Sequence, residues 1–368
     1  MRAPHLYVHV PFCSRRCAYC DFSIAVRRVV PVSEYLTALS TELDRAVQGQ
    51  ERSSLRTLYF GGGTPSRLGA DGVTQMLALV ESRFDLEADA EVTLEANPED
   101  VTRDAVSAWR RAGVNRLSIG IQSFDDSILE WMHRTHSSID ASRAVEAARR
   151  AGISNLSIDL IFALPDSLNR SWRSDLERAL DLDPEHISLY GLTVERGTPL
   201  GRWEASGKVT AAPEDGYAEQ FLLAHEVMAD AGFDHYEVSN FARSGLSSRH
   251  NSAYWTGATY MGAGPSAHSF DGESRRWNVS PYAEWQTRLS AGESVVEESE
   301  NLTDANRRAE SVYLGLRTTR GYHATSHDLE IARDWVKPGW ANIENETVRL
   351  TPEGWLRLDS LAAGLTGR

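Results

Sequence analysis

The sequence has few cysteines, no long apolar run and no excess of positive charge. Its 368 residues include three cysteines, and all of them lie between positions 13 and 20. No early apolar stretch has the flanks of a signal peptide, and no apolar run approaches the length of a membrane span. Pairing into disulfides would leave one cysteine over, so we expect free thiols in a reducing, cytoplasmic environment.

The charge of the chain is acidic. Asp and Glu number 52 against 38 Lys and Arg, which gives a net charge of -14. Phosphate binding depends on clustered Lys and Arg, and the basic run at Arg27-Arg28 is short. We therefore expect no general nucleic-acid binding. The length allows one large domain and a smaller one, with ample residues for a buried core.

The three cysteines directly follow an apolar run at positions 6–12. Cys13, Cys17 and Cys20 are separated by four and three residues, which allows their sulfurs to converge on one metal centre. Three thiolates leave one iron of a four-iron cluster open, as a catalytic or substrate-binding cluster requires. A zinc site with His9 as fourth ligand, or thiols that only pack in the core, are the alternatives at this point.

Short β-branched and apolar runs alternate with amphipathic stretches along the first half of the chain. This alternation predicts a parallel sheet curved into a full or partial barrel, with a flat doubly wound sheet as the competitor. Ser33 and Thr102 are expected N-caps, and Gly113 and Gly152 are expected just beyond helix ends. The predicted strands are 6–10, 57–60, 91–95, 116–121, 156–161 and 186–192, and the predicted helices are 33–47, 71–84, 102–112, 141–151 and 171–182.

Barrel proteins build their sites beyond the carboxyl ends of the strands, and this sequence places polar and glycine-rich segments there. The first strand leads into the cysteines. The second ends in Gly61-Gly-Gly-Thr-Pro65, the third in Glu95-Ala-Asn-Pro98 and the fourth in Gly120-Ile-Gln-Ser-Phe124, while the fifth contains Asp159. Their placement at one rim predicts a functional site there.

These residues resemble the radical S-adenosylmethionine superfamily, whose CxxxCxxC hallmark reads here Cys13, Cys17 and Cys20. Within it the chain is similar to the oxygen-independent coproporphyrinogen III oxidase group, through the segments at 7–13, 59–65, 95–98, 120–124 and 159–161 and through Arg134. The resemblance implies an α/β fold, a partial (βα)6 barrel with a smaller C-terminal winged-helix-like α+β domain. It also implies a [4Fe-4S] cluster on the three thiolates, with S-adenosyl-L-methionine chelating the fourth iron.

The contacts of this nucleotide follow from the matched positions. Backbone N–H groups at 62–64 can approach a polar ligand because glycine has no Cβ. Glu95 and Asp159 can accept hydrogen bonds from an ammonium group or ribose hydroxyls, and the fork of Arg134 can bind a carboxylate. Tyr19 is expected over the adenine. The predicted contacts are Tyr7, Tyr19, Gly62, Gly63, Thr64, Glu95, Gln122, Arg134 and Asp159.

Two departures separate this chain from the oxidase. The oxidase resembles CxxxCxxCxC, whereas Phe22 stands at the position of the further cysteine, and only Met1 to His5 precede the first strand where the oxidase carries an extension. His250-Asn-Ser-Ala-Tyr254-Trp255 matches the HNxxYW motif of the HemW-type haem chaperones. This resemblance implies haem binding and delivery, without a catalytic residue. Radical decarboxylation of a porphyrinogen is the alternative, and a zinc-binding regulatory domain is the third hypothesis.

The HNxxYW match makes His250 the predicted axial ligand of haem, because a neutral imidazole binds iron well. His133, His136, His235 and His268 are competing candidates. The implied partners are haem and haem-accepting proteins. We expect no membrane span, while peripheral association through a partner, and either a monomer or a homodimer, are compatible with the sequence.

The predicted domains are a barrel at 1–235, a connecting segment with the HNxxYW motif at 236–300 and a winged-helix-like domain at 301–368. A helix at 212–232 and a strand at 235–238 precede a loop at 241–279. A helix at 303–316, a hairpin at 343–350 and a closing helix at 351–361 complete the chain. Winged helices often bind DNA, but this one is not strongly basic, so we expect a lid or a partner surface.

Overall fold

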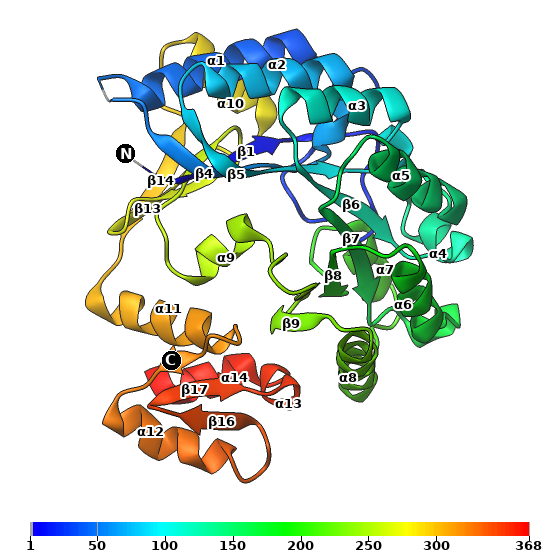
Figure 1. Cartoon of the computed structure of the whole chain (residues 1–368), viewed down its shortest axis with the longest axis vertical. Coiled ribbons are helices and arrows are strands. Elements are labelled where there is room, and N and C mark those ends of the chain that lie inside the picture. Colours follow the sequence, from blue (N-terminus) through cyan, green and yellow to red (C-terminus); the bar gives the residue numbers. More distant parts are fainter. Residues whose placement is uncertain (1–2, 50, 368) are drawn as a thin grey trace.

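The protein is described by a computed structural model covering residues 3–49 and 51–367, so Met1, Arg2 and the outer limits of the predicted domains lie outside the described residues. Its main feature is a nine-stranded sheet whose six central strands are parallel and pair in chain order (Figure 1). The six predicted strands are confirmed. They are β1 (His5–Val10), β4 (Ser54–Gly62), β5 (Asp85–Ala96), β6 (Arg116–Gln122), β7 (Leu156–Phe162) and β8 (His186–Gly191).

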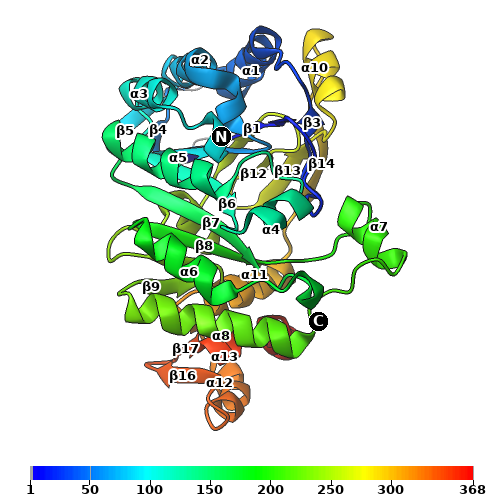
Figure 2. The same cartoon turned by 90° about the vertical axis from the view of Figure 1, so that its right-hand side faces the viewer.

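The strand order distinguishes a partial barrel from a doubly wound sheet. Right-handed crossovers that always advance in one direction leave every helix on the same face, whereas a doubly wound sheet reverses and is covered on both faces. Figures 1 and 2 show the helices along the outer side of the curved sheet. These helices are α1 (Val32–Val47), α2 (Gly69–Glu81), α3 (Arg103–Ala112), α5 (Ser138–Arg150) and α6 (Trp172–Asp181). The partial (βα)6 barrel is therefore confirmed.

The core lies between the sheet and this helical layer. Leu6, Val8 and Val10 of β1 are fully buried in the main hydrophobic cluster, together with Leu39 and Leu43 of α1. Successive side chains of a strand point to opposite faces, so the residues that alternate with these apolar ones face the barrel interior. The outer face of the sheet thus supplies stability, and the inner face is left for polar side chains.

The helix boundaries follow local hydrogen bonding. Thr102 caps α3 by accepting a hydrogen bond from the backbone N–H of Ala105 at 3.3 Å, as predicted. Gly113 follows α3 with a φ of 121°, a conformation that glycine adopts without steric cost. The prediction for Ser33 is wrong, because α1 already begins at Val32 after Pro31 and has no side-chain cap.

The predicted connecting segment forms part of the barrel sheet. The antiparallel strands β10 (Asn240–Ala242) and β9 (Asp234–Glu237) extend the sheet beyond β8, and β11 (Met261–Ala263) pairs in parallel with β1 at the other edge. A domain boundary at 235/236 would cut β9. The long loop predicted at 241–279 is also wrong, because this region further contains α9 (Arg249–Trp255), β12 (His268–Phe270) and β13 (Ser274–Asn278).

The remaining elements complete the barrel rim and the C-terminal part. A three-stranded sheet joins β12, β13 and β14 (Val296–Asn301), and another joins β15 (Tyr322–His323), β17 (Thr347–Leu350) and β16 (Ala341–Glu344). Helices and a hairpin in this order are those expected of a winged-helix-like domain, an assignment that stays a prediction. The other elements are β2 (Phe12–Cys13), β3 (Ala25–Val26), α4 (Asp126–Trp131), α7 (Pro199–Ala205), α8 (Glu214–Asp230), α10 (Tyr282–Ser290), α11 (Asp304–Leu316), α12 (Ser326–Ala332), α13 (Pro352–Trp355) and α14 (Leu358–Thr366).

Within the two described stretches, no helix is both long enough and apolar enough to cross a membrane.

Candidate functional site

The cysteine loop begins where β1 has ended, at the carboxyl rim of the barrel. Cys13 closes the short strand β2, which pairs in parallel with β3. The backbone of Ala18, within the loop, donates a 3.0 Å hydrogen bond to the carbonyl of Met132 and accepts one of 2.8 Å from Leu200 in α7. Contacts with two distant segments therefore fix the loop that carries all three thiols.

The three thiols line one cavity of 420 Å³, which we call the inner cavity. The Sγ atom of Cys13 lies 3.5 Å from Thr64 Oγ1, and that of Cys17 lies 3.5 Å from Arg134 Nη1. Burial raises the pKa of the Cys20 thiol to about 11. Iron that binds here must therefore displace a proton from the thiol.

The donor set fits a cluster better than a single ion. No group of three or more His, Cys, Asp or Glu side chains in residues 3–49 and 51–367 is arranged to hold one metal ion. In an iron–sulfur cluster each thiolate binds its own iron, so the sulfurs need to share a cavity rather than one point. His9, the candidate fourth zinc ligand, is already engaged, since its Nδ1 lies 3.1 Å from Tyr7 Oη and its Nε2 lies 2.9 Å from the Ser23 carbonyl.

The glycines after β4 allow close approach of the chain to its neighbours. Gly62 has a φ of 108°, and a Cβ atom there would lie 2.4 Å from the His9 ring. A Cβ atom on Gly63 would lie 2.6 Å from a backbone atom of Pro11. The N–H of Gly62 donates to Glu95 Oε2 at 3.0 Å and that of Gly63 to the Val10 carbonyl at 2.8 Å. These two N–H groups are thus used inside the protein, contrary to the expectation that they face a ligand.

Two carboxylates project into the inner cavity from β5 and β7. Glu95 Oε1 accepts a 2.7 Å hydrogen bond from Tyr59 Oη, and burial raises the pKa of Glu95 to about 7. Asp159 accepts hydrogen bonds of 3.0 Å from Ser118 Oγ, and burial raises its pKa as well. Each carboxylate retains lone pairs for a donor in the cavity.

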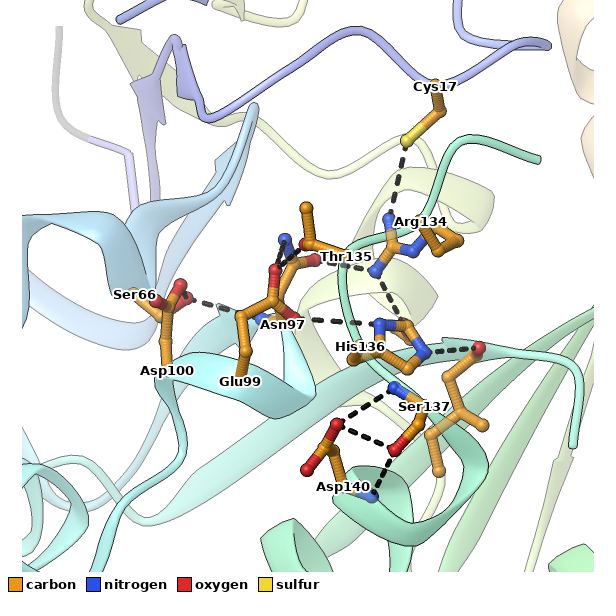
Figure 3. Close-up of polar contacts among 12 residues, drawn as sticks. Cys17, Ser66, Asn97, Glu99, Asp100, Arg134, Thr135, His136, Ser137 and Asp140 are labelled. Carbon is orange, nitrogen blue, oxygen red and sulfur yellow. Dashed lines mark hydrogen bonds and ion pairs between the residues drawn. The ribbon is translucent and has the colours of Figure 1, made fainter. Parts of the chain in front are cut away.

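Arg134 lies beside the cysteine loop with most of its guanidinium engaged. Figure 3 shows the side chain pointing toward the sulfur of Cys17. Its Nη2 donates to Asn97 Oδ1 and to the Gly120 carbonyl, both at 2.7 Å. The predicted binding of a carboxylate by this fork would have to displace these acceptors. The geometry instead places a fixed positive charge beside the Cys17 sulfur.

The segment after Arg134 is anchored to the rim of the barrel. Thr135 donates to a carboxylate oxygen of Glu99, and His136 Nε2 lies 3.0 Å from the Ile121 carbonyl (Figure 3). Ser137 then forms a capping box with Asp140 at the start of α5. Thr135, His136 and Ser137 each have a hydrogen-bond partner, so the backbone that carries the Arg134 side chain is held at the rim.

Most of the predicted cofactor contacts meet in the inner cavity. Tyr7 and His250 do not line it. The Tyr7 ring stacks on that of Tyr59, a lining residue, with 6.0 Å between the ring centroids. The predicted contacts that line it are Tyr19, Gly62, Gly63, Thr64, Glu95, Gln122, Arg134 and Asp159.

The HNxxYW motif forms helix α9 rather than an open loop. His250 is 1% exposed, with Nδ1 2.6 Å from Thr57 Oγ1 and Nε2 2.9 Å from Tyr254 Oη. Burial lowers its pKa to about 3, so the ring is neutral. The backbone N–H groups of Arg249 and His250 both donate to Glu91 at 2.9 Å. Iron could reach His250 only after one of its hydrogen bonds had been broken, which argues against the predicted axial ligand.

Several residues of the inner cavity were not predicted from the sequence. Arg116 is 1% exposed at the start of β6 and lines the cavity, and its Nε atom has no hydrogen-bond partner among the described residues. Asn251 also lines it, as does Tyr190, which the sequence places at the end of the sixth predicted strand on the same rim. A charged residue at the start of the apolar run 116–121 was a usable signal for Arg116, because buried Arg is rare without a function or a partner. Asn251 belongs to the HNxxYW motif but carried no separate signal.

Comparisons with known proteins agree with this arrangement. A family model described as the radical SAM superfamily matches residues 7–179. The heme chaperone HemW of Bacillus subtilis is 34% identical over 362 residues, covering 95% of this chain and 96% of that protein. HemW of Synechocystis is 36% identical over 325 residues, covering 86% and 78%.

A solved structure is similar over nearly the whole chain. It is Escherichia coli coproporphyrinogen III oxidase (HemN), described as a radical SAM enzyme, with a TM-score of 0.84 at 21% identity and coverage of 99% of this chain and 90% of that one. This likeness shows the fold. Taken with the sequence relatives, it places the chain in the HemW family of radical S-adenosylmethionine proteins.

Proposed function

We propose that this protein is a haem chaperone of the cytoplasm, which binds haem and delivers it to acceptor proteins on a radical S-adenosylmethionine scaffold. The observation that carries the proposal is full-length similarity to relatives named heme chaperone HemW. The HNxxYW residues support it, because they form an ordered helix, α9, at the barrel.

The inner cavity fits the two cofactors that the family implies. Cys13, Cys17 and Cys20 would hold a [4Fe-4S] cluster, and S-adenosyl-L-methionine would chelate the remaining iron. When bound, the reduced cluster supplies an electron to the sulfonium. Glu95 and Asp159 offer acceptors to the ammonium and ribose groups, and Arg134 donates a hydrogen bond to the Cys17 sulfur.

The oxidase alternative has less support from the residues beside the cluster. Phe22 stands where the oxidase has a further cysteine, lines the inner cavity and is 65% exposed. A phenyl ring can neither bind iron nor transfer a proton. The cavity therefore lacks one group of the porphyrinogen-decarboxylating relatives.

The test is a paired assay on one sample. The cluster is reconstituted anaerobically, and haem binding and turnover of coproporphyrinogen III are then measured on the same protein. We expect a stable haem complex and no turnover. Turnover without a stable haem complex would overturn the proposal in favour of the oxidase. Bound zinc together with the absence of iron–sulfur absorbance would favour the zinc-binding regulatory domain.

A further inference from the structure

A second cavity lies next to the last turn of α9, outside the barrel. It has a volume of 640 Å³, and we call it the outer cavity. Its walls come from the end of α9, from the strands β12 and β13, and from helix α11. Figure 1 shows α9 between the barrel sheet and α11. Cavities of about 300–1,000 Å³ are typical of small-molecule and cofactor sites.

The lining of the outer cavity is largely aromatic. Tyr254 and Trp255 contribute from α9, Tyr260 and Phe270 from the β12 side, and Tyr313 from α11. Tyr254 and Tyr260 meet edge to face, with 4.7 Å between ring centroids. Aromatic walls favour a flat, apolar ligand, which can stack on ring faces or meet ring edges.

One histidine of this lining has a free imidazole. His268 is a solvent-exposed residue of β12 whose ring stacks on Trp277 at 5.7 Å, and in residues 3–49 and 51–367 no hydrogen bond to its ring nitrogens is found. Burial lowers the pKa of His268, which favours the neutral form that binds iron. Trp277 fixes the plane of the ring without using either nitrogen.

The other candidate histidines are engaged or lie elsewhere. His250 uses both ring nitrogens, and His136 faces the Ile121 carbonyl and Glu99. His235 Nδ1 lies 3.1 Å from His225 and its Nε2 lies 3.2 Å from the Val238 carbonyl. His133 lines the inner cavity with the cysteines. Of the predicted ligand candidates, His268 alone combines a free ring with an aromatic cavity large enough for a cofactor.

We propose that haem binds in the outer cavity, with a ring nitrogen of His268 as an axial ligand of the iron and the aromatic side chains of α9, β12 and α11 against the macrocycle. This assignment rests on the proposed haem-binding function and adds the site. Binding involves coordination only, with no change of oxidation state.

The charged residues of the outer cavity suit a dicarboxylate ligand at its edge. Arg275 is the one cationic side chain of the lining, and it pairs with Glu310 across the cavity, Nη1 to Oε1 2.8 Å and Nη2 to Oε2 3.2 Å. A propionate group can replace the Glu310 carboxylate on the guanidinium without leaving a buried charge, because the side chains of Arg275 and Glu310 are both partly exposed to water.

The test is a ferric haem titration of the reconstituted, full-length protein followed by absorption and electron paramagnetic resonance. His268→Ala should weaken haem affinity at least about tenfold, as expected for loss of one strong ligand bond, and should change the ligand-field signature. Free imidazole should restore the wild-type spectrum in His268→Gly. His323→Ala, an exposed histidine on β15, is the matched control and should bind like the wild type.

A second variant tests the cavity apart from the ligand. Leu314→Trp places an indole into the outer cavity from α11 and should reduce haem affinity while the cluster content stays unchanged. The outcomes separate the two proposals. If the wild type binds no haem, the proposed function fails. If the wild type binds haem and both His268→Ala and Leu314→Trp leave affinity and spectrum unchanged, the function stands and the assignment to the outer cavity is overturned.

Discussion

The two cavities that meet α9 differ in chemistry. The inner cavity collects thiols, carboxylates, hydroxyls and three arginines, and burial raises the pKa values of Glu95 and Asp159. The outer cavity is lined by aromatic rings with a single arginine paired to a glutamate. A charged, hydrogen-bonding nucleotide fits the first, and a flat macrocycle fits the second. The difference teaches that one helix borders two cavities whose linings suit ligands of different chemistry.

The largest expected effect is loss of the cluster alone. Cys17→Ala should abolish the iron–sulfur absorbance, because a thiolate ligand is missing, while leaving circular dichroism unchanged, since the loop lies at the rim outside the main hydrophobic cluster. Ferric haem should still bind in the outer cavity. Loss of haem binding in a folded variant would show that the two cavities are not chemically separate.

Replacing the buried histidine of α9 should cost stability rather than iron coordination. His250→Ala should lower the free energy of unfolding by about 2–4 kcal/mol, since it leaves a cavity and removes two buried hydrogen bonds. Urea unfolding followed by circular dichroism measures this change. Tyr254→Phe, which removes one of the two bonds, should cost about 1 kcal/mol. A shifted haem spectrum with unchanged stability in His250→Ala would return the ligand to His250.

The inner cavity should respond to pH through Glu95. Burial raises the pKa of Glu95 to about 7, so the carboxyl group is mostly protonated below this pH. The protonated carboxyl group has no negative charge with which to bind the ammonium group of the nucleotide. Affinity for S-adenosyl-L-methionine should rise with pH and level off above about 7, with about a tenfold difference between pH 6 and pH 8. Equilibrium dialysis of the reconstituted protein checks this. In Glu95→Gln this pH dependence of nucleotide affinity should vanish. The haem affinity of the wild type should not show the same pH dependence.

The smallest expected effect concerns the rim of the outer cavity. Glu310→Gln removes the bidentate partner of Arg275 and leaves only Glu300 Oε1 at 3.3 Å, so a haem propionate competes with one carboxylate fewer. An ion pair of this exposure is worth about 0.2–1 kcal/mol, which corresponds to an increase in haem affinity of roughly 1.4- to 5-fold. Fluorescence-quenching titration resolves such a change. A decrease would place the propionates away from Arg275.

The barrel could be predicted from the sequence because each of its strands and helices is long enough to show a period. The predicted strand at 156–161 and the predicted helix at 102–112 match β7 and α3 to within one residue at each end. The region 241–279 could not be predicted in the same way. Its strands β10, β11 and β12 have three residues each, and α9 has seven. These elements are too short for the alternation of apolar and polar residues to reveal a strand or a helix.

The sequence indicated which residues belong to the candidate site, but not how deeply they are buried or which hydrogen bonds they form. Motif spacing grouped the cysteines with eight further residues that line the same cavity, because the ends of parallel strands meet at one rim. Spacing carries no information on which ring nitrogens are already bonded. The motif therefore favoured His250 over His268, although His250 is buried with two partners and His268 is exposed.

Helix α9 is short enough that its two ends border different cavities. Asn251 in its first turn lines the inner cavity and Trp255 in its last turn lines the outer one, about 6 Å apart along the helix axis. The two proposed ligands would therefore contact one short helix at its opposite ends. If nucleotide binding shifts α9, the haem affinity changes by a coupling factor, and thermodynamic reciprocity requires haem to change the nucleotide affinity by the same factor.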